Sequence, residues 1–200
     1  MTVSITGIGV GSGIKTAIGH ATLLTHGAAH IEPRWVLNSD IEQEVSRFYR
    51  AVEVAETQLR DIRKQIPADT PADILEFIDT HLLMLEDKAI SEAPVEIIRR
   101  EGCSAEWALQ LRRDAMIRVF EDMEDPYLRE RGSDVRDLGR RILMHLQNLE
   151  VRSVNYQPGT VLVGEEISAM QVAAVPRECL AGIISATGSG SSHVAILARG

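Results

Sequence analysis

The stretch Gly182–Arg199, GIISATGSGSSHVAILAR, predicts a strand, then a turn of small residues, then the start of an apolar helix. The turn contains glycines, which let a backbone approach an anion closely, and serines, which add hydroxyl donors. A helix N-terminus carries unpaired N–H groups and positive partial charge. His193 lies at that start, and an unperturbed imidazole, with a pKa of about 6.5, is available there in its neutral, nucleophilic form. A lone histidine in this setting is chemically able to accept, hold and pass on a phosphoryl group, although most such histidines only begin a helix.

The composition is that of a globular chain with an acidic central part. Of the 200 residues, 44% are hydrophobic, enough for one good core or two modest ones. The net charge of -8 argues against nucleic acid as a main partner, because a phosphate backbone attracts basic surfaces. The excess of acidic residues lies within residues 37–150, which suits a basic protein partner as well as an ordinary solvated helical surface.

The cysteine and histidine patterns do not indicate a metal site. Cys103 and Cys179 are far apart, so we expect neither a structural zinc nor a disulfide framework, and we expect a reducing compartment. The row His20, His26 and His30 lacks a nearby cysteine or a suitable acidic cluster. The sequence shows no basic leader with a long apolar run and no stretch of membrane-spanning length, so we expect a cytoplasmic protein without a membrane partner.

The pattern of the chain changes twice along its length. From about residue 37 to residue 149, apolar residues recur at three- and four-residue spacing between charged ones, which is typical of amphipathic helices. Cap residues and prolines predict five helices there, which end near residues 66, 85, 102, 123 and 149. After this region, Thr160–Val163 and Leu180–Ser185 are predicted strands, with a short predicted helix at 167–174 between them.

These patterns predict an α/β unit formed by both chain ends, residues 1–36 and 150–200, with an all-helical subdomain, residues 37–149, inserted between them. The chain extends only about one and a half turns into the helix that begins at His193, which is too short to cover a face of a sheet. We therefore expect a fragment of a longer protein.

Three stretches resemble enzyme I of the phosphoenolpyruvate-dependent phosphotransferase system or its nitrogen-related paralogue. The run Ser189–Arg199 resembles the family's phosphohistidine signature, which is approximately Gly-Gly-x-Thr-Ser-His-x-x-Ile-x-Ala-Arg. Two further runs, Phe77–Asp87 and Asp125–Gly139, are similar to parts of the family's helical insert. The three stretches lie in the expected order over most of the chain, which makes the resemblance more specific than one motif alone.

The resemblance is not complete. Ser189 replaces a glycine of the signature and Ser191 replaces its threonine, so hydroxyl groups are added or kept. The run Ser168–Val172 stands where the family often has a Thr-Pro-Ser-like stretch, and it is poorer in hydroxyls. We therefore expect the nucleophile to be intact and the hydrogen bonding around it to differ.

The resemblance implies a swivelling α/β phosphohistidine domain with an inserted all-α, carrier-binding subdomain. It implies that Nε2 of His193 receives phosphate from phosphoenolpyruvate, bound in a missing C-terminal domain that also holds Mg2+, and passes it to a histidine of the carrier protein HPr or a paralogue. The residues implied to stabilise the phosphoryl group are Gly190, Ser191, Ser192 and Arg199. Those implied to dock the carrier are His81, Met84, Asp87, Ile90 and Arg136. The full-length enzyme is expected to be a homodimer and this chain a monomer.

Other interpretations stay open at the level of sequence. The mobile phosphohistidine domain of pyruvate phosphate dikinase or phosphoenolpyruvate synthase shares the histidine signature, but the two helical matches disfavour it. A docking module that binds a carrier without turning over phosphate is an alternative of another class. His81 and Met84 equally fit partly buried packing, and Arg136 equally fits an ion pair within its helix. Roles in sugar transport and in nitrogen regulation both fit the sequence.

Overall fold

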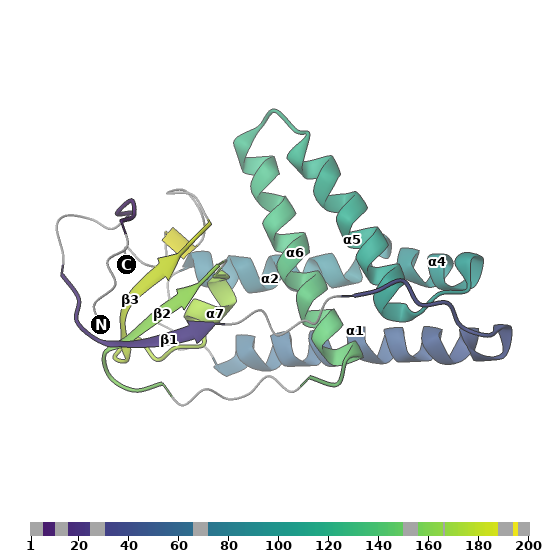
Figure 1. Ribbon diagram of the computed structural model, residues 1–200, viewed down its shortest axis with the longest axis horizontal. Coiled ribbons are helices and arrows are strands. Elements are labelled where there is room, and N and C mark those ends of the chain that lie inside the picture. The colour runs from purple at the N-terminus through teal and green to yellow at the C-terminus, as the bar shows by residue number, and fades with distance from the viewer. Residues whose placement is uncertain are drawn as a thin grey trace. The chain divides into compact units, whose positions relative to one another are not determined.

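The computed structural model describes residues 6–10, 16–24, 31–65, 72–149, 156–165, 167–187 and 194–195. The chain divides into two compact units. The sheet unit comprises Met1–Thr25 and Val154–Gly200, and the helical unit comprises His26–Ser153. Figure 1 labels helices and strands in both units.

The sheet unit contains a three-stranded parallel sheet whose strands come from both ends of the chain (Figure 1). Strand β1, His20–Leu24, pairs with β2, Thr160–Gly164, and β2 pairs with β3, Leu180–Ser185. Helix α7, Ala169–Ala173, lies between β2 and β3 in the sequence. The two predicted strands are confirmed, and their parallel pairing explains the intervening helix, because parallel neighbours need a crossover connection.

Two glycines determine how β1 meets the turn before β2. Gly159 has a φ of 82°, in the left-handed region that favours glycine. A Cβ atom on Gly19 would overlap the carbonyl oxygen of Gly159. The His20 N–H donates to that same carbonyl at 2.8 Å, so the backbones must approach closely where the β1–β2 pairing begins.

One face of the sheet carries the core of the sheet unit. The buried members of this core are Leu162, Ile167, Val172, Val175 and Cys179. Val194, which directly follows His193 in the sequence, is partly buried against them, and Ala195 is buried. On the opposite face, Leu23 pairs with Val163 and Val163 with Ile184, and the first and last of these three are exposed.

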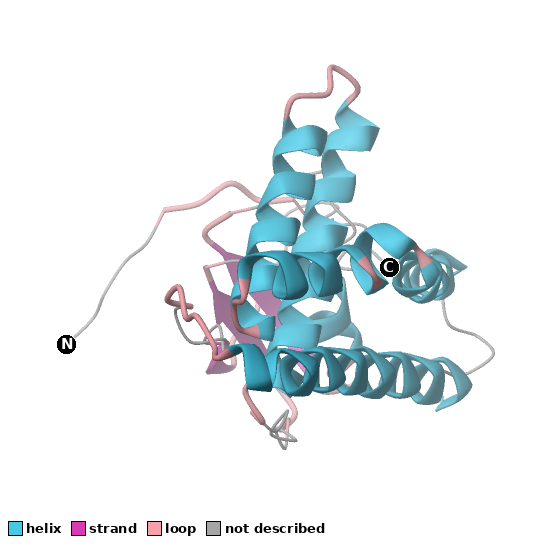
Figure 2. Ribbon diagram, turned by 90° about the vertical axis from the view of Figure 1, so that its right-hand side faces the viewer, coloured by secondary structure: helices cyan, strands magenta, loops and turns pink. Residues whose placement is uncertain are grey.

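The helical unit has helices at all five predicted places. They are α1, Ile41–Gln65; α2, Ala72–Glu86; α4, Ala93–Glu101; α5, Ala105–Glu121; and α6, Pro126–Leu146. A sixth, short helix that the sequence did not predict, α3, Lys88–Ser91, follows α2. Figure 2 shows that helices make up most of this unit and that α5 and α6 form a hairpin. Across the described parts of the chain, none of the helices has the length and apolarity that crossing a membrane requires.

Local signals in the sequence explain several helix ends. The hydroxyl of Ser104 accepts from the N–H of Trp107 at 3.3 Å, which makes Ser104 the N-cap of α5. Gly102, with a φ of 61°, ends α4 in the left-handed conformation. A 3-10 turn, Asn38–Asp40, precedes α1, and within it the hydroxyl of Ser39 donates to the Asp40 carboxylate at 2.8 Å.

Residues 31–36 belong to the helical unit, whereas the sequence-based boundary placed them in the α/β unit. The Val36 N–H donates to the carbonyl of Gly102, and the carbonyl of Arg34 accepts from the N–H of Ser104, both at 2.8 Å. Trp35 adds an antiparallel bridge to Cys103. The segment is held by backbone hydrogen bonds, which leave no periodic side-chain pattern for a sequence-based prediction to detect.

Charged side chains link residues 31–36 to helices α1, α5 and α6 of the same unit. We call Arg34, Glu44, Arg47 and Glu106 the ion cluster. The Glu44 carboxylate, whose side chain is 8% exposed, accepts from Arg34 at 3.1 Å, from Arg47 at 2.7 Å and from the Ala105 N–H at 2.9 Å. Arg47 also pairs with Glu106 and donates to the carbonyl of Leu146, at the end of α6, at 3.0 Å. One cluster therefore holds both the entry to the helical unit and the end of its last helix.

Candidate functional site

The predicted phosphoryl-accepting residue and its neighbours lie outside the described residues. These are His193 together with Gly190, Ser191, Ser192 and Arg199. The structure does describe the residues on either side, Thr187 and Val194. Thr187 follows the carboxyl end of β3, and ligands of parallel α/β sheets commonly bind outside that edge.

At this edge, hydrogen bonds from the end of β3 converge on the residue that follows β2. The carbonyl of Glu165 accepts from the hydroxyl of Ser185 at 3.2 Å, from the hydroxyl of Thr187 at 3.0 Å and from the N–H of Thr187 at 2.9 Å. The Ala186 N–H donates to the carbonyl of Gly164 at 3.1 Å. We call the three bonds to Glu165 the strand-end latch. The latch holds the backbone at Ser185–Thr187, which precedes the segment that contains His193 in the sequence.

The run Ser168–Val172 contains one hydroxyl, that of Ser168, and this hydroxyl bonds within the run. The Gln171 N–H donates to the Ser168 hydroxyl at 3.2 Å, and the Ser168 N–H donates to the Gln171 side-chain oxygen at 2.9 Å. This reciprocal pair is a capping box at the start of α7. The Ser168 hydroxyl is buried and serves the end of its own helix in this structure.

Among the residues expected to dock a carrier, His81 lies inside the helical unit. It is 2% exposed, and its ring centroid lies 4.1 Å from that of Phe77. Nδ1 of His81 lies 2.9 Å from the carbonyl oxygen of Phe77, and because a carbonyl only accepts, Nδ1 carries the proton of this bond. Ile90, on α3, is buried as well. The side chains of His81 and Ile90 therefore lie in the interior of the helical unit, beneath the surface of α2 and α3.

Asp87 and Met84 lie closer to solvent at the corner between α2 and α3. Asp87 is exposed, and its carboxylate accepts from the Ala89 N–H at 2.8 Å, which makes it the N-cap of α3. Met84 is half-buried. Arg112 of α5 donates to the carbonyl of Ala89 at 2.9 Å and so joins this corner to the α5–α6 hairpin.

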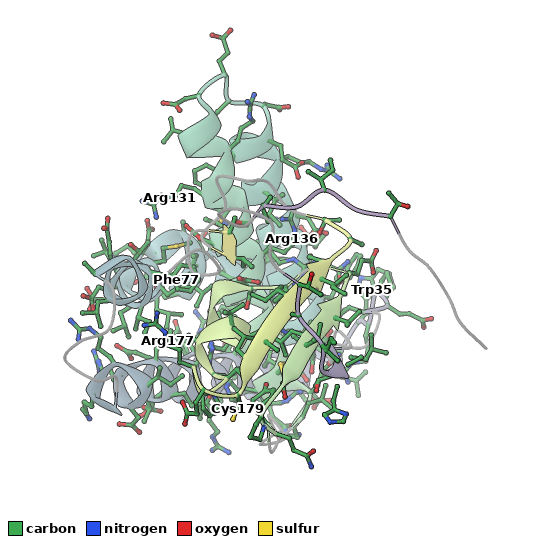
Figure 3. All side chains as sticks on the ribbon, turned by 90° about the vertical axis from the view of Figure 1, so that its left-hand side faces the viewer. Trp35, Phe77, Arg131, Arg136, Arg177 and Cys179 are labelled. Carbon is green, nitrogen blue, oxygen red and sulfur yellow. The ribbon has the colours of Figure 1, made fainter. Side chains whose placement is uncertain are left out.

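Arg136 lies on that hairpin, away from the α2–α3 corner in the sequence. Its guanidinium is 3.3 Å from the carboxylate of Glu121, a contact between α6 and α5. Figure 3 labels Arg136 and Arg131 on α6 and Phe77 on α2. Gly132 of α6 lies beside Phe120 of α5, and a Cβ atom added to it would make an ordinary van der Waals contact with Phe120 at 3.5 Å. The structure thus groups four predicted docking residues on α2 and α3 and places the fifth on α6.

Sequence reasoning missed two exposed apolar residues on these elements. Leu83 on α2 is 68% exposed and Val119 on α5 is 59% exposed. Helical periodicity contained the signal for Leu83, because Ile78, His81 and Leu85 follow the buried stripe and leave Leu83 on the other face. Leu83 is thus an exposed apolar neighbour of the half-buried Met84 on α2.

No group of three or more His, Cys, Asp or Glu residues that could hold a metal ion occurs in the described part of the chain.

Two family models match the chain in succession. The model of the N-terminal domain of PEP-utilising enzymes, in which PEP is phosphoenolpyruvate, matches residues 6–131. The model of the mobile domain of PEP-utilising enzymes matches residues 156–200. The chain therefore belongs to the family of PEP-utilising enzymes.

Curated relatives indicate which of the PEP-utilising enzymes the chain is similar to. The chain is 31% identical over 209 residues to a phosphoenolpyruvate-protein phosphotransferase of Cupriavidus necator, and the match covers all of this chain and 35% of that protein. It is 34% identical over 200 residues to a phosphoenolpyruvate-protein phosphotransferase of Listeria innocua, covering all of this chain and 34% of that protein. The chain spans about a third of the length of these relatives.

Solved structures support the fold. A solution structure of Enzyme I matches with a TM-score of 0.75 at 27% identity, covering 91% of this chain and 74% of that one. An N-terminal domain of nitrogen Enzyme 1 matches with a TM-score of 0.63 at 27% identity, covering 84% of this chain and 68% of that one. The helix-rich fold of this chain is therefore that of the Enzyme I N-terminal domain.

Proposed function

We propose that this chain is the N-terminal phosphotransfer portion of an enzyme I-type phosphoenolpyruvate-protein phosphotransferase. The observation that carries the proposal is the succession of the N-terminal and mobile-domain matches, the second of which includes the signature around His193. Relatives with the same name match the whole length of this chain. In this function His193 receives phosphate from phosphoenolpyruvate, which binds in a part of the relatives that this chain does not match.

The chemistry assigned to His193 is two successive displacements at phosphorus. The lone pair of the neutral imidazole Nε2 attacks the phosphoryl group, the bond from phosphorus to the enol oxygen breaks, and the oxygen departs with that electron pair. The carrier's histidine then attacks the same phosphorus, and the bond to Nε2 breaks. Backbone amides near Gly190 and the hydroxyls of Ser191 and Ser192 stabilise the phosphoryl oxygens, and Arg199 adds positive charge.

The carrier, HPr or a nitrogen-related paralogue, docks on the helical unit in this proposal. The α2–α3 corner offers apolar contact through Leu83 and Met84 and negative charge through Asp87, and Arg136 adds a cation on the hairpin. His81 and Ile90, both buried, hold this surface in shape rather than project from it. The acidic excess of residues 37–150 favours a carrier with a basic face.

The sheet unit acts as the swivelling phosphohistidine domain, and the helical unit is its inserted carrier-binding subdomain. The pairing of β1, from one end of the chain, with β2, from the other, supports a domain formed from both ends. By the family resemblance, Mg2+ and the dimer interface belong to the C-terminal part of the full-length enzyme, and the protein acts in the cytoplasm.

A transfer assay tests the proposal. The chain is incubated with phosphorylated HPr, or with its phosphorylated nitrogen-related paralogue, and acid-labile phosphate on His193 is measured by mass spectrometry. We expect transfer that is lost in His193→Ala and retained in His20→Ala, which removes an exposed histidine of the same unit. The better donor identifies the branch. Absence of transfer to a folded chain from either carrier, or transfer that survives His193→Ala, would contradict the proposal.

A further inference from the structure

The surface proposed to dock the carrier has two parts that come from different regions of the chain. Met84 and Asp87 lie at the α2–α3 corner, whereas Arg136 lies on α6 of the α5–α6 hairpin. A carrier that contacts both parts at once requires them to keep a fixed spacing. If the spacing varied in the free protein, binding would have to order it, and the cost of that ordering would weaken the affinity.

The corner has little internal support. Helix α3 comprises four residues, and a helix of a single turn is not stable without contacts from outside. Its N-cap is the exposed Asp87, and its buried residue is Ile90. Helix α3 packs against its sequence neighbours α2 and α4. A direct tie from α3 to the hairpin must therefore come from α5 or α6.

Arg112 of α5 supplies such a tie. Its Nε donates to the carbonyl of Ala89 on α3 at 2.9 Å. Arg112 is half-buried, and a hydrogen bond from a charged donor is stronger than one between neutral groups. Ala89 lies between Asp87 and Ile90 in the sequence, so the bond acts on the backbone of the corner itself.

Helix α5 joins the two parts of the proposed surface. Arg112 bonds to α3, and Glu121, the last residue of α5, pairs with Arg136 of α6 at 3.3 Å. Both contacts start from one continuous helix of 17 residues. The nine helical steps from Arg112 to Glu121 correspond to about 14 Å along the helix axis. The helix therefore sets the distance between the two bonded groups.

We propose that Arg112 is a positioning residue for docking of the carrier protein. Its bond to the Ala89 carbonyl holds the α2–α3 corner at a fixed spacing from the hairpin, so that the carrier meets Asp87 and Arg136 already in place. The bond acts on the affinity for the carrier and leaves the chemistry at His193 unchanged. This inference rests on the proposed function, because the spacing matters only if a carrier docks on this surface.

The test compares Arg112→Met with Arg112→Gln, and the donor is the better of the two phosphorylated carriers. Both substitutions remove the charge, but glutamine places an N–H donor at the position of the arginine Nε, whereas methionine places a methyl group there. We expect Arg112→Met to raise the donor concentration at half-saturation of His193 phosphorylation about fivefold, with the rate at saturating donor unchanged. Arg112→Gln should stay within about twofold of the unsubstituted chain.

Arg100→Met is the matched control, because it removes an exposed arginine of α4 that pairs with its neighbour Glu101 at 2.8 Å. Its half-saturation should equal that of the unsubstituted chain. Hydrogen exchange of the α3 amides should rise in Arg112→Met and not in Arg112→Gln. A cooperative thermal transition in each variant shows that the helical unit is folded.

An unchanged half-saturation in Arg112→Met overturns this inference alone. A glutamine variant that binds the carrier as weakly as the methionine variant also overturns it, because the charge rather than the bond would then be responsible. An equal shift in Arg100→Met has the same consequence. Absence of phosphorylation in the unsubstituted chain overturns the proposed function and this inference with it.

Discussion

Replacing Glu44 by Gln should destabilise the helical unit far more than the same change at Glu42, one helical turn or less away on α1. Glu44 accepts hydrogen bonds from three residues, two of them arginines, and its side chain is 8% exposed. Glutamine keeps a single acceptor oxygen and loses the charge, which leaves Arg47 with Glu106 as its remaining carboxylate partner. Hydrogen bonds between charged groups contribute about 1.5–3 kcal/mol, and both arginines are partly exposed, so we expect a loss of about 2–3 kcal/mol.

Urea unfolding followed by circular dichroism at the helical band measures this loss. Glu42→Gln is the control, because the Glu42–Arg99 pair is exposed on both sides and solvent screening should leave it little effect on stability. The slope of the free energy against urea must be the same for the variants, so that the shift in midpoint reports stability. A loss below about 1 kcal/mol at Glu44, or one no larger than at Glu42, would refute the assignment of the ion cluster as the main polar fastening of this unit.

The pH dependence of stability tests the role of Glu44 in a second way. Burial alone would raise the pKa of Glu44, but hydrogen bonds from Ala105 and Arg47 and the charges of Arg47 and Arg34 outweigh it and lower the pKa below the usual 4.5. The folded state therefore holds the proton less tightly than the unfolded state. The stability due to Glu44 is fully present above pH 4.5 and is lost as the pH falls through the lowered pKa, so the deficit of Glu44→Gln should shrink on acidification.

Two more perturbations follow from other parts of the fold. Gly19→Ala should destabilise the sheet unit by about 2 kcal/mol or more, because its Cβ meets the backbone of Gly159, whereas Gly9→Ala, with nothing nearby, should cost little. Hydrogen exchange of the β2 amides distinguishes the two, and equal effects would contradict the close approach of these backbones. Burial, and then the charge of Arg141, lower the pKa of His145 below the usual 6.5. The contribution of His145 to stability is therefore present above pH 6.5 and lost as the pH falls through the lowered pKa, and an NMR titration that gives a pKa of 6.5 or higher would be inconsistent with this.

Apolar periodicity made the helices predictable. On α1, Val45, Phe48, Ala55 and Leu59 are buried at three-, four- and seven-residue spacing, and this stripe marks the helix in the sequence as clearly as in the structure. Helix α3 escaped prediction because it has only four residues and its start, Asp87, stands in a charged run that hides its role as a cap. Residues 31–36 were misplaced because their partners are backbone groups of Gly102 and Ser104.

For the candidate site, the signature around His193 predicts a type of chemistry, and the resemblance predicts which helices meet a carrier; both stay predictions. Sequence could not show that His81 lies beneath the surface against Phe77, since a histidine four residues after a phenylalanine fits both an exposed and a buried face. The strand-end latch was equally hidden, because it joins Glu165 to residues that are distant in the sequence and adjacent only when β2 and β3 pair.

The ion cluster also bears on how the chain folds. His20 pairs with Thr160 in the sheet, and a contact so distant in sequence ordinarily requires closing a long, entropically costly loop. Arg34 and the carbonyl of Leu146 meet at Glu44 and Arg47, so folding of the helical unit brings its own entry and exit together. Once that unit has formed, β1 and β2 search for each other across two short connections. We therefore expect formation of the helical unit to shorten the loop that must close when β1 pairs with β2, and so to speed formation of the parallel sheet.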